Sequence, residues 1–299
     1  MKRGVISIGT NSTRALVAAL NGIPEILLTR SIGTRIGEAL KESGRLGEEP
    51  MHRTLEAVRE HVAAVRELTT DIRSIATSAL RRADNGEAFT QRVREITGVP
   101  LEVISGEEEA RRSFLGAVSG IDASAGTSFG VLDTGGGSTE YAVGEKNRAL
   151  QIVSCEIGAV RLTEAVRELA GTSGIVEDSS IERACEIAMR ALKPLEGFPP
   201  VDRLVCVGGS ATTAIALLHE NRELFSYAQL YRSDLRQLIA RLRAQDLRVR
   251  KTLPGMNPQR ADILLAGLLI IDLVFELARH DRALVSTNDL LLGTLFTPT

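Results

Sequence analysis

The sequence predicts an α/β protein in which one strand-rich unit occurs twice. Two polar turns that contain glycine support this prediction, because each lies between two short apolar runs typical of strands. The turns are 126 residues apart, so that Gly9 coincides with Gly135 and Ser12 with Ser138. A repeat of about half the chain length indicates two related domains rather than a solenoid.

The second turn has the sequence Asp-Thr-Gly-Gly-Gly-Ser-Thr-Glu over residues 133–140. We expect its glycines to adopt conformations closed to other residues and to turn successive N–H groups toward phosphate oxygens. Carboxylate and phosphate oxygens are the usual ligands of Mg²⁺, so Asp133 and Glu140 are candidate metal ligands. The alternative is a glycine-rich hairpin with solubilising acids. The candidate phosphate-binding residues of this turn are Gly135, Gly136, Gly137 and Ser138.

The first turn follows the apolar run at residues 5–8 and precedes a second strand over 15–20. Ser7 stands in this copy where Asp133 stands in the other. A third glycine-rich turn follows the predicted strand 201–207, and either binds an anion at a helix start or only connects strand to helix. The candidate phosphate-binding residues of the first turn are Gly9, Thr10, Asn11 and Ser12.

The composition is that of an ordinary globular protein, with 43% hydrophobic and 25% charged residues in 299. A net charge of −2 and the absence of Trp argue against general nucleic-acid binding and base stacking. Three widely spaced cysteines predict no disulfide framework or zinc site. The chain shows no signal peptide, and its most apolar stretch, 263–275, is too short to span a bilayer. We therefore expect a cytoplasmic protein with no membrane segment.

The order of predicted elements repeats in the two halves. The predicted strands are 3–9, 13–20, 24–31, 72–76 and 101–104, then 128–133, 139–144, 149–155, 201–207 and 283–286. The predicted helices include 50–68, 86–97, a helix capped by Ser105 that runs to 118, 233–243, 258–279 with Asn257 as N-cap, and a last helix from 288. The small, polar stretch 120–128 predicts domains of 1–124 and 125–299.

Two such halves with facing glycine-rich hairpins match the ribonuclease H-like, actin-like plan. That plan predicts two duplicated ribonuclease H-like domains that bind a polyphosphate in an interdomain cleft.

Several segments, taken in order, resemble the motifs of the exopolyphosphatase/guanosine pentaphosphate phosphatase family (Ppx/GppA), of the sugar kinase/Hsp70/actin superfamily. The resemblance covers nearly the whole chain. The chain is similar to the short, two-domain form of the family. The stronger matches are residues 8–12, 76–81, 103–111 and 133–140, and the weaker ones are 207–213, 260–267 and 285–286.

The resemblance implies hydrolysis of the terminal phosphoryl group of inorganic polyphosphate, or of the 5′-γ-phosphate of guanosine pentaphosphate. It implies Glu109 as the general base that activates water, and Arg81 as a cation that neutralises phosphate oxygens. It also implies Asp133 and Glu140 as ligands of Mg²⁺, with Mn²⁺ as a substitute. The expected partners are polyphosphate, guanosine pentaphosphate or guanosine tetraphosphate, and a second copy of the chain in a homodimer.

The chain departs from the family pattern at Ser7, which replaces an aspartate that most members have. A serine offers a neutral oxygen, so we expect weaker metal binding and slower catalysis. Thr134 replaces an aliphatic residue, and no Arg-Glu pair precedes Gly293. Exopolyphosphatase is the main hypothesis. The alternatives are a guanosine pentaphosphate phosphohydrolase, a non-catalytic sensor of polyphosphate or alarmone, and a kinase-like activity.

Overall fold

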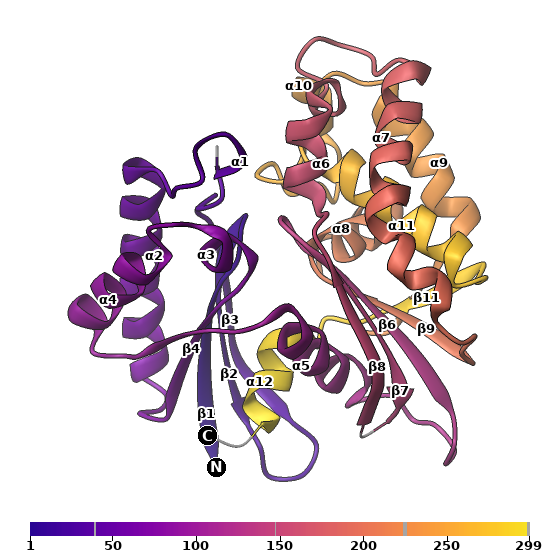
Figure 1. The fold of residues 1–299 in the computed structure, drawn as a ribbon. Helices are drawn as coiled ribbons and strands as arrows, with labels where there is room; N and C mark the ends of the chain where they lie inside the picture. Colours follow the sequence, from indigo (N-terminus) through magenta and orange to yellow (C-terminus); the bar gives the residue numbers. More distant parts are fainter. Residues whose placement is uncertain (39, 147, 224–225, 298–299) are drawn as a thin grey trace. The chain divides into compact units, whose positions relative to one another are not determined.

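The computed structural model describes residues 1–38, 40–146, 148–223 and 226–297 (Figure 1). The chain forms two compact units. Unit 1 contains Met1–Gly116 together with the C-terminal segment that begins at Leu290, and unit 2 contains Ala117–Asp289. Each unit has its own sheet and its own hydrophobic core.

Unit 1 is built on a five-stranded sheet in the order β3-β2-β1-β4-β5. β1 to β3 form an antiparallel meander, and β4 and β5 continue the sheet parallel to β1. The strands are β1 (Lys2–Ile8), β2 (Ser12–Ala19), β3 (Glu25–Gly33), β4 (Ile72–Ala76) and β5 (Leu101–Val103).

Helices cover both faces of this sheet, because successive strand residues point to opposite sides. Ile6 is buried in the cluster that contains Val58 and Val62 of α2. Its neighbour Val5 is buried in the cluster that contains Leu291 of α12. The helices of unit 1 are α1 (Leu40–Ser43), α2 (Glu48–Arg66), α3 (Ser78–Arg82), α4 (Gly86–Thr97), α5 (Gly106–Val118) and α12 (Leu290–Phe296).

Unit 2 repeats this topology with one added strand. Its sheet order is β10-β11-β9-β6-β7-β8, in which β6 to β8 are an antiparallel meander and β9 and β11 run parallel to β6. Without β10 the order is that of unit 1, so the predicted duplication of a ribonuclease H-like unit is confirmed. The strands are β6 (Ser128–Thr134), β7 (Thr139–Glu145), β8 (Arg148–Cys155), β9 (Arg203–Val207), β10 (Ala228–Tyr231) and β11 (Arg282–Val285).

The core of unit 2 is centred on α11, which contacts α6, α7, α8 and α9. This position explains its almost wholly apolar sequence. In the described part of the chain, no helix combines the length and apolar character needed to span a membrane. The helices are α6 (Ala159–Ala165), η1 (Arg167–Ala170), α7 (Asp178–Leu192), η2 (Lys193–Gly197), α8 (Gly209–Leu218), α9 (Arg232–Arg243), α10 (Leu247–Thr252) and α11 (Leu264–Leu277).

The units differ from the sequence-based domains 1–124 and 125–299 in two respects. Unit 1 ends at Gly116, and it also contains α12, which the sequence assigned to the second half. α12 buries Leu290, Leu291 and Leu295 against the sheet face formed by β1, β2 and β4. Dividing the sequence at a polar linker cannot show that a C-terminal segment packs back against the first unit.

The predicted helix start at Pro258 is wrong, because α11 begins at Leu264. The N–H of Arg260 donates to the Asn257 carbonyl at 2.9 Å, and the N–H of Ile263 donates to the Arg260 carbonyl at 3.1 Å. Two successive turns therefore precede the helix. The Asn257 side chain accepts from the N–H of Gln259 and so stabilises the first turn.

Candidate active site

The hairpin between β6 and β7 closes with one backbone hydrogen bond. The N–H of Gly135 donates to the Ser138 carbonyl at 3.0 Å. Asp133 and Glu140 lie directly opposite each other in the antiparallel pair, immediately before and after this hairpin. The two predicted metal ligands are therefore neighbours in space.

Helix α6 holds the carbonyl side of the hairpin. The N–H of Ala159 donates to the Gly135 carbonyl at 2.9 Å, and the N–H of Val160 donates to the Gly136 carbonyl at 2.9 Å. In a trans peptide the N–H points opposite to the C=O. The N–H groups of Gly136 and Gly137 consequently point away from α6, and among the described residues they donate no backbone hydrogen bond. Two parallel donors of this kind suit an anion.

The glycines of this hairpin do not have the backbone conformations that the sequence predicted. None of Gly135, Gly136 and Gly137 has a positive φ. Close approach bears on Gly135, where a Cβ would lie 3.2 Å from the Ser138 carbonyl oxygen, and on Gly158, where a Cβ would lie 2.6 Å from the Gly136 carbonyl oxygen. The prediction of conformations closed to other residues is wrong here. The nearby left-handed residue is Gly208, with φ 87°.

Gly208 makes room for the carboxylate of Asp133. β6 pairs with β9 so that Asp133 is opposite Val207, the residue before Gly208. A Cβ on Gly208 would lie 2.8 Å from Asp133 Oδ1. On the other side of the same turn, a Cβ on Gly209 would lie 2.0 Å from Cζ of Arg260. A carboxylate and a guanidinium thus flank the turn that starts α8.

Arg260 was not among the predicted site residues. Its only sequence signal was the weak family match over 260–267.

The carboxylate of Glu140 is buried, with 2% of the residue exposed. It accepts a hydrogen bond of 2.7 Å from the hydroxyl of Ser154 on β8. Side chains directly opposite on antiparallel strands have Cβ atoms about 5 Å apart, and like charges at that separation are destabilising unless a cation lies nearby. The acid pair of Asp133 and Glu140 therefore favours a bound cation.

The acid pair fits Mg²⁺ better than a softer metal. In the part of the chain that the structure describes, no three His, Cys, Asp or Glu side chains gather as a metal site. A cation held by two carboxylates would take its remaining ligands from water and phosphate, as Mg²⁺ commonly does.

Burial, and then the charges of Glu140 and Glu156, raise the pKa of Cys155 to about 11, so this thiol stays protonated.

The hairpin between β1 and β2 has the same closure. The N–H of Gly9 donates to the Ser12 carbonyl at 3.0 Å. The carbonyl of Thr10 accepts from Gly37 at 3.1 Å, so the N–H of Asn11 points away from that contact. In the described chain, Thr10 and Asn11 donate no backbone hydrogen bond.

A serine and an arginine replace the acid pair in unit 1. Ser7 is opposite Arg14 in the pairing of β1 with β2, at the positions of Asp133 and Glu140. Ser7 is buried. This hairpin therefore has a positive charge where the other has two negative charges.

Glu109 is the buried member of the three acids at the start of α5. Glu107 is exposed, Glu108 is half-buried and pairs with Arg112 at 2.7 Å, and Glu109 is 8% exposed. Arg81 donates through Nη1 to Glu109 Oε2 at 2.7 Å and to the Ile104 carbonyl at 2.9 Å. The structure thus brings together the predicted base and the predicted cation.

Arg81 retains one donor beyond the contact with Glu109. Its Nη2 is buried and has no protein partner. Ser78, in the same segment, is also fully buried and its Oγ has no protein partner. The N–H of Thr77 donates to the Ile8 carbonyl at 3.2 Å, which places this segment beside the first hairpin. Sequence reasoning missed Ser78, although it lies in the matched segment 76–81.

The profile of the Ppx/GppA phosphatase family matches residues 16–295 of this chain. The chain is 32% identical to exopolyphosphatase 2 of Mycobacterium tuberculosis, over 96% of this chain and 95% of that protein. It is 29% identical to the bifunctional 3-dehydroquinate synthase/phosphatase of Fusobacterium nucleatum, over 98% of this chain but 46% of that protein.

A third relative is the guanosine-5′-triphosphate,3′-diphosphate pyrophosphatase of Vibrio parahaemolyticus, with 29% identity over 97% of this chain. The chain spans 58% of that protein. A solved structure of the Aquifex aeolicus PPX-GPPA enzyme matches with a TM-score of 0.81 and 29% identity, over 99% of this chain and 98% of that one.

Proposed function

This chain belongs to the Ppx/GppA phosphatase family, and we propose that it hydrolyses the terminal phosphoanhydride bond of inorganic polyphosphate to release orthophosphate. The observation that carries the proposal is the β6–β7 hairpin. It combines the acid pair with two consecutive N–H groups that point away from α6. The exopolyphosphatase relative is also matched over 95% of its length.

Glu109 is proposed as the general base. Its carboxylate would accept a proton from a water molecule, whose oxygen then attacks the terminal phosphorus. The bridging P–O bond breaks, and its electron pair stays on the oxygen of the shortened chain. The ion pair with Arg81 holds the Glu109 carboxylate in place. The free Nη2 of Arg81 is available for the negative charge that develops on the phosphoryl oxygens.

Asp133 and Glu140 would hold Mg²⁺, with Mn²⁺ as a substitute. The metal supplies neutralisation of phosphate charge. The N–H groups of Gly136 and Gly137, and those of Thr10 and Asn11 in the other hairpin, would bind phosphate oxygens. Ser7 adds no charge, so the metal would depend on the acid pair of unit 2.

A guanosine pentaphosphate 5′-phosphohydrolase is the second candidate. It is supported by the Vibrio parahaemolyticus relative, of which this chain spans 58%. A catalytically weak sensor of polyphosphate or alarmone is the third, and the absence of an acid at Ser7 favours it. We place the protein in the cytoplasm, as a homodimer, within the same proposal.

The test is orthophosphate release from long-chain polyphosphate and from guanosine pentaphosphate, with Mg²⁺ or Mn²⁺. We expect faster release from polyphosphate, and loss of release in Glu109→Gln. Glu107→Gln is the matched control, because it removes an exposed acid from the same helical turn. Faster release from guanosine pentaphosphate would select the second candidate. Binding of either compound without release would select the sensor.

A further inference from the structure

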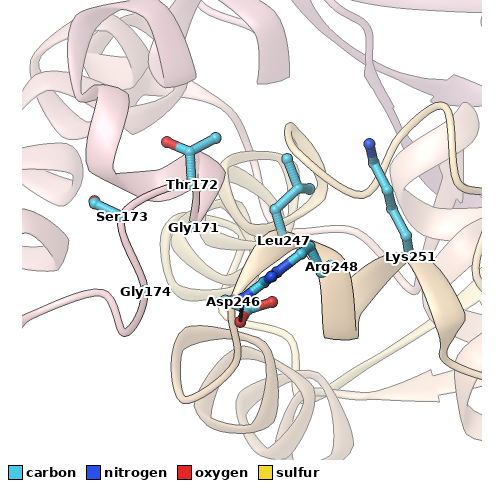
Figure 2. A pocket seen from close by; sticks show the side chains of 8 residues that line it. All are labelled: Gly171, Thr172, Ser173, Gly174, Asp246, Leu247, Arg248 and Lys251. Carbon is cyan, nitrogen blue, oxygen red and sulfur yellow. Dashed lines mark ion pairs between the residues drawn. The ribbon is translucent and has the colours of Figure 1, made fainter.

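Unit 2 contains a cavity of about 480 Å³ outside the site described above. It lies between the turn after η1 and the start of α10, and Figure 2 shows the two segments facing each other. The lining residues are Gly171, Thr172, Ser173, Gly174, Asp246, Leu247, Arg248 and Lys251.

The cavity wall presents hydrogen-bond donors. Among the described residues, the side chains of Thr172, Ser173 and Lys251 form no hydrogen bond or ion pair. Arg248 is 94% exposed and only loosely paired, at 3.6 Å, with Asp246. Asp246 already accepts from the N–H of Val249 at 2.9 Å. The wall thus offers two hydroxyls and two cationic side chains against one carboxylate.

A buried arginine lies directly behind this wall. Arg250 is fully buried, and its three hydrogen bonds go to the carbonyls of Leu242, Gln245 and Leu169. Its Nη2 has no protein partner. A Cβ on Gly171 would lie 2.8 Å from this Nη2, so the guanidinium lies against a residue that lines the cavity.

The arginine is charged and forms no ion pair among the described residues, although the carboxylate of Asp246 attracts it. Burial lowers the pKa of Arg250 to about 10, which still leaves the group charged at neutral pH. None of its hydrogen-bond acceptors is a carboxylate, so its charge is not neutralised by an ion pair. The charged residues that line the cavity are Arg248, Lys251 and Asp246, and Arg250 lies behind Gly171. Positive charges therefore outnumber negative charges at the cavity.

Helix α6 links this cavity to the β6–β7 hairpin. α6 begins at the Gly135 and Gly136 carbonyls, and η1 continues the chain to Gly171. Figure 1 shows α6 extending from the hairpin end of the sheet toward α10. The helical path is about 10 Å for α6 and about 8 Å for η1. A chain of several phosphates could reach from one place to the other, whereas a single phosphate could not.

We propose that this cavity binds a phosphate group of the polyphosphate chain, away from the end that is hydrolysed. The inference rests on the proposed function, because it assigns a second contact to the same substrate. Lys251 and Arg248 contact the phosphate oxygens, the two hydroxyls donate to them, and Arg250 adds fixed positive charge behind Gly171. A phosphate chain has oxygen acceptors on every unit, which suits several donors of modest strength.

The test measures binding by calorimetry to the full chain, with long-chain polyphosphate, tripolyphosphate and orthophosphate as probes. The cavity variant is the double substitution Arg248→Ala/Lys251→Ala. The matched control is Arg190→Ala/Lys193→Ala, which removes two exposed charges at the end of α7 in the same unit. A second variant, Thr172→Glu, places a negative charge in the cavity without removing a cation.

We expect both cavity variants to weaken long-chain binding about tenfold or more, and tripolyphosphate binding less than twofold. The control should bind all three probes as the wild type does. Equal long-chain affinity in wild type and cavity variants would overturn the inference. The inference would also be overturned if the cavity bound orthophosphate and its affinity did not depend on the length of the phosphate chain.

Failure of the proposed function would look different. The wild type would then release no orthophosphate from polyphosphate, whatever the cavity variants do to binding.

Discussion

The two glycine hairpins share a backbone and differ in charge. Gly9 and Gly135 each donate to a serine carbonyl at 3.0 Å. A Cβ at these positions would lie 3.3 and 3.2 Å from the same carbonyl oxygens. Between the flanking strands, however, unit 1 pairs Ser7 with Arg14, whereas unit 2 pairs Asp133 with Glu140. The duplication has kept a candidate phosphate-binding hairpin twice and a candidate metal site once.

The hairpins also differ in what holds them. The first is held by the loop after β3, through Gly37 and Arg35. The second is held by the first turn of α6. The N–H groups of a helix start are fixed by the helix itself, so the second hairpin has the more rigid support.

The largest expected effect separates the two hairpins at equivalent positions. Asp133→Asn removes a proposed metal ligand and should lower activity at low Mg²⁺ by at least about 100-fold, with partial recovery as Mg²⁺ is raised. Ser7→Asn changes the matching residue of unit 1 and should alter activity little. Mg²⁺ titrations of orthophosphate release measure both. Equal losses in the two variants would show that the hairpins share the metal.

The next comparison tests the support of each hairpin. In Gly158→Ala, the new Cβ would lie 2.6 Å from the Gly136 backbone, which cannot easily move. In Gly37→Ala it would lie 2.3 Å from the Thr10 methyl group, which can rotate away. We expect about 1–3 kcal/mol of destabilisation for Gly158→Ala and less for Gly37→Ala. Urea unfolding measures both, and the reverse order would contradict the assignment of the firmer support to α6.

A smaller effect is expected from restoring an acid in unit 1. Ser7→Asp should lower the Mg²⁺ concentration needed for half-maximal release only modestly, because Arg14 lies opposite and would pair with the new carboxylate. Ser7→Asp/Arg14→Leu removes that competition and should lower the Mg²⁺ concentration needed for half-maximal release severalfold. If the single variant matched the double variant, Arg14 would not control the charge of this hairpin.

The smallest effect concerns His61, which is fully buried under the first hairpin and donates from Nε2 to the Thr13 carbonyl at 3.1 Å. Burial lowers its pKa, with a smaller contribution of the same sign from Arg30. The unfolded chain therefore binds a proton near pH 6.5 that the folded chain does not. The contribution of neutral His61 to the free energy of unfolding should be fully present above pH 6.5. Below pH 6.5 the free energy of unfolding should fall by up to about 1.4 kcal/mol per pH unit.

His61→Leu should remove this part of the pH dependence. Urea midpoints at neutral and mildly acidic pH measure it. The same pH slope in wild type and variant would assign the effect to other groups.

The repeat in the sequence predicted the topology of both units, because glycine turns between apolar runs mark the same hairpin twice. It also placed Asp133 and Glu140 on either side of one turn as candidate metal ligands, and the structure pairs them across the hairpin. It could not predict that α12 joins unit 1, because a run of leucines fits any apolar surface. The added strand β10 was missed for a different reason, because its four residues show no strong pattern.

Within the candidate site, the sequence indicated which residues belong to it better than it indicated which of them contact each other. The ion pair of Arg81 with Glu109 depends on the path of β4 and β5, which local patterns do not contain. The position of Arg260 against Gly209 depends on the two turns before α11, where a proline signal had predicted a helix. Contacts between segments far apart in the sequence are set by packing rather than by propensity.

The most direct test is hydrolysis of polyphosphate in water labelled with heavy oxygen, by wild type and Glu109→Gln at saturating Mg²⁺. We expect each released orthophosphate to carry one oxygen from water, and the rate to fall about 10²–10⁴-fold in the variant. Orthophosphate without the label, or an unchanged rate in Glu109→Gln, would contradict a mechanism in which Glu109 activates water.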